Sequence, residues 1–123
     1  MSKESRFGHL IDNWEAVKQE VREILIECAR QRKTITYGEL SSRLKTAHIP
    51  AYSYAMSALL GEIIREGEAE EWGILATLVV RKSDGLPGAG YFKAMAARGI
   101  PASEYRAIWE TEFKRVCDYW QQH

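Results

Sequence analysis

The chain has 123 residues, which is enough for one domain with one core and short for two. Its composition of 46% hydrophobic and 28% charged residues excludes global disorder, and the formal net charge of zero gives no bulk argument for a polyanionic partner. Residues 1–12 lack the apolar core of a signal peptide, and no apolar run is long enough to cross a membrane. We therefore expect a soluble, cytoplasmic protein with no membrane partner.

The first predicted elements are a flexible N-terminus over residues 1–12 and a long helix over residues 13–32. Apolar side chains recur at helical spacing from Trp14 to Cys28, which is typical of an amphipathic helix. The two cysteines, Cys28 and Cys117, fall on apolar helix positions without a CxxC spacing. This pattern predicts buried, reduced thiols.

The next segment predicts two helices joined by a turn. A short strand over residues 33–36 leads into a helix over residues 38–44, and Pro50 disfavours helical backbone at the residue before it. A second helix is expected over residues 51–66, with its apolar side chains on one side. This order is typical of a helix-turn-helix.

The segment that follows predicts a β-hairpin. Residues 72–80 are almost all apolar and end in β-branched side chains, residues 83–88 form a glycine-rich turn, and Tyr91 and Phe92 begin a return strand. Residues 33–92 then make a helix-turn-helix plus wing, followed by a short helix over 93–98 and a C-terminal helix over 102–121. The predicted class is α+β: one winged helix-turn-helix domain over residues 1–123, with a small β-hairpin or sheet and two long flanking helices.

Charge is distributed unevenly along the chain. Residues 29–61 carry Arg30, Arg32, Lys33, Arg43 and Lys45 against one acid, Glu39. Residues 81–98 carry Arg81, Lys82, Lys93 and Arg98 against Asp84. If the wing lies on the same side as the helix-turn-helix, the two groups predict a basic face that contacts phosphate in a salt-dependent way.

Base-reading side chains are missing from the predicted second helix, because residues 51–64 contain no Lys, Arg, Asn or Gln. Small residues and tyrosines at its start suit close approach to a DNA backbone or insertion of a ring at a base step, and they suit a protein interface equally well. The candidate DNA-binding residues are Tyr37, Arg43, Lys45, Tyr52, Ser53, Tyr54, Arg81, Lys82 and Tyr91.

Catalytic and metal-binding patterns are sparse. The histidines at positions 9, 48 and 123 show no metal-ligand spacing, and the acidic run from Glu66 to Glu71 is typical of a solvated linker. The loop Gly85–Gly90 lacks the Gly-Lys-Ser/Thr ending of a P-loop, although three glycines in six residues leave a bound ligand or partner open. We expect no enzyme activity, no metal and no cofactor.

Three segments resemble the C-terminal DNA-binding domain of the O6-alkylguanine-DNA alkyltransferases and the alkyltransferase-like proteins. The run TYGEL at residues 36–40 is similar to that family's entry to the helix-turn-helix, and residues 50–59 are similar to its recognition helix. Residues 75–80, with SDG at 83–85 and Gly90-Tyr91, are similar to its active-site stretch. The resemblance covers roughly residues 17–92 and does not include the long C-terminal helix.

The chain departs from that family at its reactive positions. The nucleophilic cysteine falls on Ala76, the following histidine on Thr77, and the arginine that props open the base stack on Tyr54, while the asparagine before the active-site strand is replaced by an acidic insertion over residues 67–72. Alkyl transfer needs a thiolate. The resemblance therefore implies a lesion reader that flips a base, with Tyr54 filling the gap and Tyr37 near the rotated phosphate.

Three classes of function remain open for this chain. The leading interpretation is a non-enzymatic winged-helix protein that reads lesions or regulatory sites in double-stranded DNA. The alternative is a protein-binding winged-helix module, such as an immunity protein, inhibitor or regulatory subunit, or a homodimer through the long helices, since the chain is neutral and has four tryptophans. An enzyme that uses the glycine-rich loop is the third, but no acid–base pair can be named for it.

Overall fold

The computed structural model describes residues 5–6 and 9–123, with side chains from residue 13 onward. Ser5–Arg6 (β1) and His9–Leu10 (β2) pair antiparallel, and α1 follows directly over Ile11–Arg30. The prediction of a flexible N-terminus falls partly on residues 1–4 and 7–8, which lie outside the described residues. The predicted first helix is confirmed, with bounds two residues earlier than expected at each end.

A capping box starts the α2–α3 pair. The Thr36 hydroxyl accepts the Glu39 backbone N–H at 3.1 Å, and the Glu39 carboxylate accepts the Thr36 N–H at 2.9 Å, so the TYGE run begins α2 (Tyr37–Arg43). In the same way the Ser53 hydroxyl caps α3 (Tyr54–Gly67) by accepting the Met56 N–H at 3.1 Å. The two predicted helices are confirmed, although the second begins three residues later than expected.

The segment Gly73–Val80 is fully buried, as its apolar sequence predicts, but the prediction of a long strand is wrong. Leu75–Leu78 form a 3-10 turn (η2), and only Val79–Val80 (β4) pair, parallel, with Ile35–Thr36 (β3). Side chains of α5 (Tyr105–Gln121) satisfy the backbone of this segment, because the Glu112 carboxylate accepts the Ile74 N–H at 2.8 Å and the Trp109 indole N–H donates to the Thr77 carbonyl at 2.9 Å. A partner strand is therefore not needed there.

The predicted hairpin wing is also wrong. After β4 a tight turn is closed by the Arg81 N–H, which donates to the Leu86 carbonyl at 2.8 Å, and helix α4 then runs over Ala89–Ala97 in place of a return strand. Tyr91 and Met95 are both buried and lie one helical turn apart, which explains why this alanine-rich stretch packs as a helix. The predicted helix over 93–98 is thus the second half of α4.

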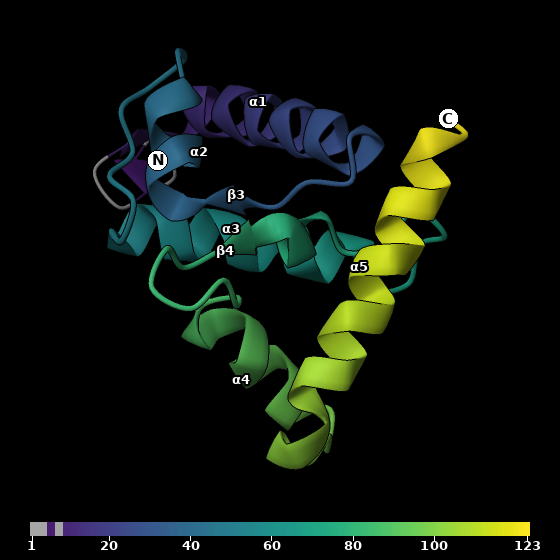
Figure 1. Ribbon diagram of the computed structural model, residues 1–123. Coiled ribbons are helices and arrows are strands. Elements are labelled where there is room, and N and C mark those ends of the chain that lie inside the picture. The colour runs from purple at the N-terminus through teal and green to yellow at the C-terminus, as the bar shows by residue number, and fades with distance from the viewer. Residues whose placement is uncertain (1–4, 7–8) are drawn as a thin grey trace.

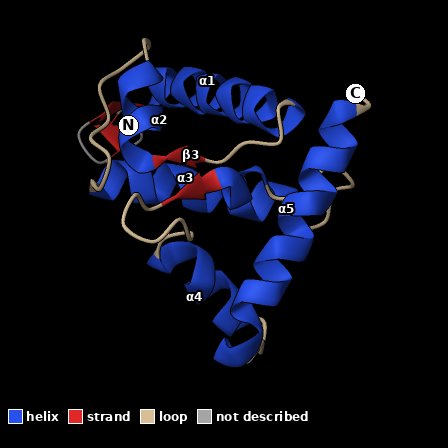
Figure 2. Cartoon of the chain, viewed as in Figure 1, coloured by secondary structure: helices blue, strands red, loops and turns tan. Residues whose placement is uncertain are grey.

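Helix α5 (Tyr105–Gln121) follows a short 3-10 turn, η3 (Ala102–Glu104), and runs from the end of α4 to the C-terminal end of α1 (Figures 1 and 2). There the Arg30 guanidinium donates to the His123 carbonyl at 3.1 Å, and Arg32 pairs with Asp118 at 2.7 Å. The two long helices therefore pack on one another within the chain. Trp14 and Trp109 of their aromatic stripes belong to the core.

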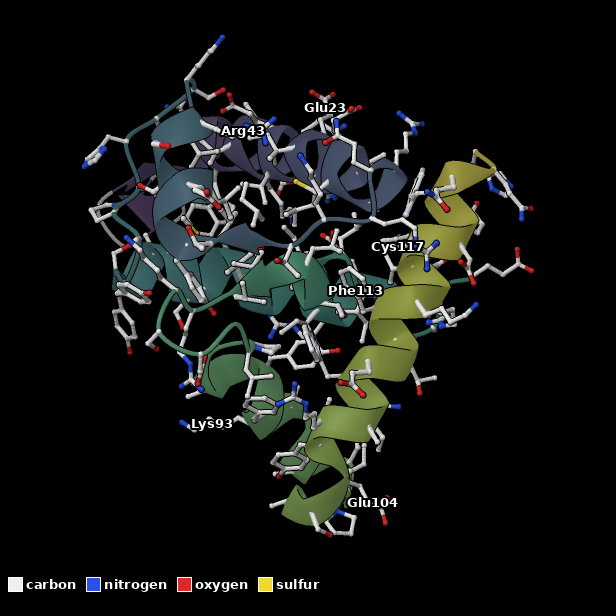
Figure 3. The ribbon with its side chains drawn as sticks, in the orientation of Figure 1. Glu23, Arg43, Lys93, Glu104, Phe113 and Cys117 are labelled. Carbon is white, nitrogen blue, oxygen red and sulfur yellow. The ribbon has the colours of Figure 1, made fainter. Side chains whose placement is uncertain are left out.

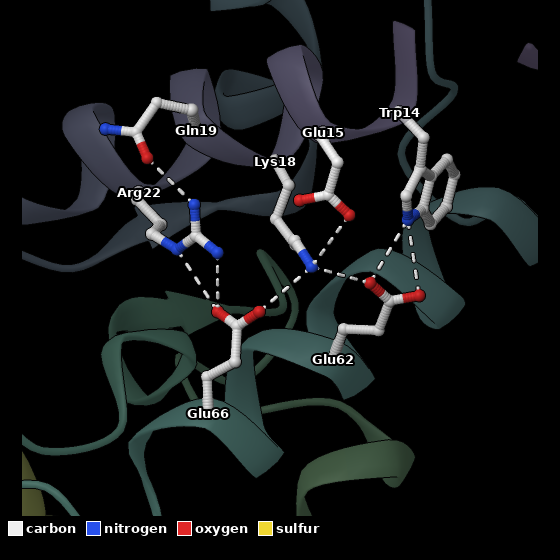
Figure 4. A network of polar contacts seen from close by, with 7 residues as sticks. All are labelled: Trp14, Glu15, Lys18, Gln19, Arg22, Glu62 and Glu66. Carbon is white, nitrogen blue, oxygen red and sulfur yellow. Dashed lines mark hydrogen bonds and ion pairs between the residues drawn. The ribbon is translucent and has the colours of Figure 1, made fainter. Parts of the chain in front are cut away.

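A buried ionic network joins α1 to α3 (Figure 4). The Lys18 ammonium lies 2.9 Å from both the Glu62 and the Glu66 carboxylates, Arg22 pairs with Glu66 at 2.8 Å, and the Trp14 indole N–H donates to Glu62 at 3.1 Å. The side chain of Lys18 is only 7% exposed. The network therefore holds one side of α3 against α1.

The described chain is mostly helical, with a small two-stranded parallel sheet, which is an α+β arrangement. The η2–β4 segment contacts α1, α3 and α5, and it forms the centre of the core. None of the helices in the described part of the chain has the length and apolar character to cross a membrane.

Candidate functional site

A surface pocket of about 250 Å³ lies where α3, the η2–β4 segment and the start of α4 meet. Its apolar wall contains Leu60, Ile64, Ala76 and Val79. Its polar members are Ser57 of α3, the backbone around Gly88–Gly90 and five of the predicted site residues. Those five are Tyr37, Tyr52, Ser53, Arg81 and Tyr91.

Tyrosines form the rim of this pocket. Tyr52 is 71% exposed, and its ring centroid lies 5.1 Å from that of Tyr37. Tyr54 follows the pocket-lining Ser53 in the first turn of α3 and is 80% exposed, but it does not itself line the pocket. Burial raises the pKa of the Tyr37 hydroxyl, although its hydrogen bond with the Gly88 backbone opposes that shift. Gly88 is needed beside Tyr37, because a Cβ there would collide with the tyrosine hydroxyl.

Tyr91 forms an inner wall of the pocket and is not an exposed wing residue, so its predicted place is corrected. It is buried on α4, and its hydroxyl lies 2.9 Å from the Thr77 hydroxyl. Burial raises the pKa of Tyr91 to about 12, so the phenol stays neutral at physiological pH. Because the carbonyl of Thr77 in turn accepts the Trp109 indole N–H, α4, η2 and α5 are tied together behind the pocket.

Arg81 reaches the pocket with its charge already partly compensated. Its guanidinium lies 2.7 Å from the Asp84 carboxylate, which also accepts the Leu86 N–H at 3.1 Å. The Leu86 N–H and then Arg81 lower the pKa of Asp84, so the carboxylate is ionised at neutral pH. The loop after β4 therefore presents Arg81 as half of an ion pair.

The other predicted cations do not line the pocket. The Arg43 guanidinium points to α1, with a nitrogen 4.0 Å from the Cys28 sulfur, and Figure 3 shows Arg43 beside α1 while Lys93 lies on α4 at the opposite side of the view. Lys45 follows α2, where its backbone N–H donates to Glu20 of α1 at 2.9 Å. Lys82 is exposed on the loop.

The structure brings the two predicted charge groups together only in part. The hydrogen bonds of Thr36 lower the pKa of Glu39 most, and the charges of Lys82 and Arg43 add to that shift, so one cation of each group lies near this carboxylate. Arg30 and Arg32 at the end of α1 bind α5, as described above. Part of the first charge group is therefore used within the fold, in contacts between the end of α1 and α5.

Groups for thiol or metal chemistry lie elsewhere or are absent from the described residues. Cys28 and Cys117 are buried free thiols, as predicted, and burial raises the pKa of both. Among the described residues that line the pocket there is no cysteine or histidine. The described part of the chain also holds no group of three or more His, Cys, Asp or Glu side chains that could bind a metal.

Sequence reasoning missed several residues around the pocket. Ser57 and Gly61 line it, and Arg65 of α3 lines an adjoining groove. Lys93 of α4 and Arg98, which follows α4, line the same groove; both belong to a predicted basic group but not to the candidate site residues. A signal was available, because positions 54, 57, 61 and 65 recur at the three- and four-residue spacing of one helix face. The prediction followed only the start of this helix.

The fold and the site together define a small, mostly helical α+β protein with a tyrosine-rimmed pocket beside the α2–α3 pair. Comparison with known proteins finds no matching family model, curated protein or solved structure.

Proposed function

We propose that this protein is a non-enzymatic DNA-binding protein that accepts an extrahelical base in the pocket between α3, η2 and α4. The α2–α3 pair then acts as the helix-turn-helix of the resemblance described above, with double-stranded DNA as the partner. Enzymes and readers that inspect a base by flipping need a snug pocket and a side chain that compensates for the lost stacking.

The chemistry of the pocket supports this proposal. Apolar side chains such as Leu60 and Val79 offer faces for a planar ring, while the hydroxyl of Ser57 and the guanidinium of Arg81 offer hydrogen bonds to its edge. Its volume of about 250 Å³ lies just under the range of about 300–1,000 Å³ that is usual for drug-sized ligands, which suits one small ring system. With Ala76 at the position of the family's cysteine, the pocket binds without transferring a group.

Tyr54 is the observation on which the proposal depends. A tyrosine that is 80% exposed at the start of a helix, directly beside a pocket rim, contributes little to the core. The same ring can enter a base step and occupy the space of a flipped base. Base–aromatic stacking is worth about 1–3 kcal/mol per ring by alanine substitution.

Replacing Tyr54 tests the proposal. We expect Tyr54→Ala to weaken binding to a labelled duplex with one mismatched base pair by about 5- to 150-fold, which corresponds to about 1–3 kcal/mol. Fluorescence anisotropy at constant salt measures the affinity. The urea midpoint should be unchanged, because the ring is mostly solvent-exposed.

The matched control is Tyr119→Ala. Tyr119 lies near the end of α5, stacked on His123 at a centroid distance of 3.9 Å, and its removal should leave the affinity as it is. Absence of duplex binding by the unaltered protein at low salt would contradict the proposal. Equal effects of both substitutions would contradict the role of Tyr54.

The alternative, a protein-binding module, is favoured by one observation: Asp84 pairs with Arg81 and partly compensates its positive charge at the pocket rim. Exposed tyrosines beside a compensated charge suit the centre of a protein interface. Retention of a partner from lysate that is unaffected by nuclease, with no binding to the mismatched duplex, is the result expected from that alternative.

A further inference from the structure

Helix α3 carries a continuous outer stripe, which we define as Tyr54, Ser57, Gly61, Arg65 and Glu68. Spacings of three and four residues put these positions on one face of a helix. They are exposed or half-buried, whereas the opposite face of α3 packs into the core. The stripe therefore runs from Tyr54, past the pocket, to the C-terminal end of the helix.

A groove between α3 and α4 continues the pocket along this stripe. It has a volume of about 440 Å³ and shares Gly61, Ile64 and Gly90 with the pocket. Beyond these shared residues its lining includes the side chains of Arg65 and Lys93, with Arg98 and the acidic Glu68 at the same groove. Figure 3 shows Lys93 at the outer side of α4.

The cations of this groove make no ion pair with the described residues, and one acid, Glu68, lines the same groove. Among the ion pairs of the described residues none involves Arg65, Lys93 or Arg98, in contrast to the paired Arg22, Arg32 and Arg81. The Arg65 guanidinium lies over Gly61, since a Cβ at Gly61 would meet its Nη1 at 3.7 Å. A positive charge therefore sits at the junction of pocket and groove.

Packing within the fold does not require glycine at two positions of the same junction, Gly61 and Gly90. A Cβ on Gly61 would make only that ordinary contact with Arg65, and a Cβ on Gly90 would meet nothing within 4 Å. By contrast, a Cβ on Gly67 would collide with the backbone of Gly73. Glycine is less favourable than alanine inside a helix, so an unforced glycine there indicates that another backbone approaches closely.

We infer that the α3–α4 groove binds the phosphodiester backbone of the strand that flanks the extrahelical base, with Arg65 and Lys93 as phosphate contacts. This inference rests on the proposed function. The twelve residues from Tyr54 to Arg65 span about 16 Å of helix, which equals the rise of about five base steps along a duplex axis at about 3.4 Å each. Phosphate contacts of this kind hold the strand in register without reading its sequence.

The salt dependence of binding tests the phosphate contacts. For the double variant Arg65→Gln with Lys93→Gln we expect the slope of log affinity against log salt, measured with the mismatched duplex, to become shallower by about 1.8, or about 0.9 for each lost contact. The matched control is Arg106→Gln with Lys114→Gln. It changes the net charge equally, at two exposed positions of α5, and should leave the slope unchanged.

Gly61→Ala tests the close approach separately. Alanine fits the fold at this position and is the better helix former, so the urea midpoint should stay the same or rise. Duplex affinity should nevertheless fall at least severalfold, because the added methyl group occupies the space of the strand. A variant that is stabilised and binds as tightly as the unaltered protein would overturn the inference.

The outcomes separate the two proposals. If the unaltered protein does not bind the mismatched duplex, the proposed function is wrong and the groove inference falls with it. If it binds, and the groove double variant keeps the slope of the control, only the groove inference is wrong. If a polyglutamate peptide with the same charge as the duplex displaces the duplex, the groove binds acidic protein segments and the inference is overturned.

Discussion

Charged side chains are paired on the side of helix α3 that faces α1, whereas Arg65 on the side that faces α4 makes no ion pair with the described residues. Toward α1, Glu62 and Glu66 are bound by Lys18 and Arg22 within 3 Å, in a network that is largely closed to solvent (Figure 4). Toward α4, Arg65 lies on the outer stripe without an ion pair in the described part of the chain. Residues four or fewer positions apart in sequence thus serve the fold on one side and remain available for a ligand on the other.

This difference shows why charge totals say little about this protein. The net charge of zero counts 17 cations against 17 acids and does not reveal which of them pair in the folded chain. What matters for a polyanionic ligand is which cations are left over after folding. On α3 and α4 these are the cations of the groove.

The largest expected effect comes from disrupting the ionic network between α1 and α3. Lys18→Ala leaves two carboxylates facing α1 with only Arg22 to compensate them, and removal of one partner from a buried ion pair costs about 3–5 kcal/mol. Because Glu62 and Glu66 are 19% and 31% exposed, we expect a loss of about 3 kcal/mol in the free energy of unfolding, measured in urea.

The control for Lys18 is an exposed pair on α5. Lys114→Ala removes a partner of Asp118 whose own side chain is 71% exposed, and its cost should stay below about 1 kcal/mol. Equal losses for the two variants would mean that the inner network is not a main support of α3.

Acid should weaken the same network. Burial alone would raise the pKa of Glu66, but Lys18 and Arg22 outweigh it and hold that pKa below its ordinary value of 4.5. The contribution of Glu66 is therefore complete above pH 4.5 and is lost as the pH falls through the lowered pKa of the folded state. Urea titrations of the unaltered protein and of Glu66→Gln should give a stability difference that narrows as the pH falls through this range.

Alkali should act on Lys18 with the opposite sign. Burial alone would lower its pKa, but the hydrogen bonds and charges of Glu62 and Glu66 raise it above 10.5. Its contribution is present below pH 10.5 and disappears as the pH rises through the raised pKa. A stability difference between the unaltered protein and Glu66→Gln that does not change with pH would contradict the network.

The smallest expected effect comes from releasing Arg81 from its ion pair with Asp84. Asp84→Asn keeps an oxygen for the Leu86 N–H but releases Arg81 from its pair. On the proposed function, duplex affinity should rise a few-fold and the salt slope should steepen by about 0.9, as for one added phosphate contact. Glu110→Gln, which releases Arg106 on α5, is the matched control and should change neither.

Local patterns predicted the helices well. Periodic apolar side chains indicated α1, α3 and α5, because the side chains on the buried face of a helix recur every three to four residues. The TYGE run indicated the start of α2 for a reason visible in the structure, since Thr36 and Glu39 cap each other within four residues. Both signals are local, so no knowledge of distant partners was required.

The strand and hairpin predictions were wrong for a different reason. An apolar run such as Gly73–Val80 indicates burial but not backbone conformation. Its conformation follows from hydrogen bonds with Trp109 and Glu112, which come more than thirty positions later in the chain. The return segment around Tyr91 likewise became helix α4 because Tyr91 and Met95 bury one face together.

The site was predicted in part. Tyr37, Tyr52, Ser53, Arg81 and Tyr91 line one pocket, as a candidate set chosen from distant segments. The roles of Tyr54 and of this pocket in DNA binding stay proposals. The Arg43 side chain turns toward α1, and the backbone of Lys45 binds Glu20 of α1. The groove cations were not among the candidate site residues, because sequence position does not reveal which way a helix face points.

By itself the sequence determined where helices begin, which of their faces are apolar, and that residues 73–80 are buried, since each follows from side chains a few positions apart. Only the tertiary structure decided that this buried run turns as η2 and pairs in parallel with β3. It also decided which cations are neutralised within the fold. Ion pairing and backbone hydrogen bonding depend on groups that the folded chain brings within about 3 Å of each other, and that proximity is not encoded in any local pattern.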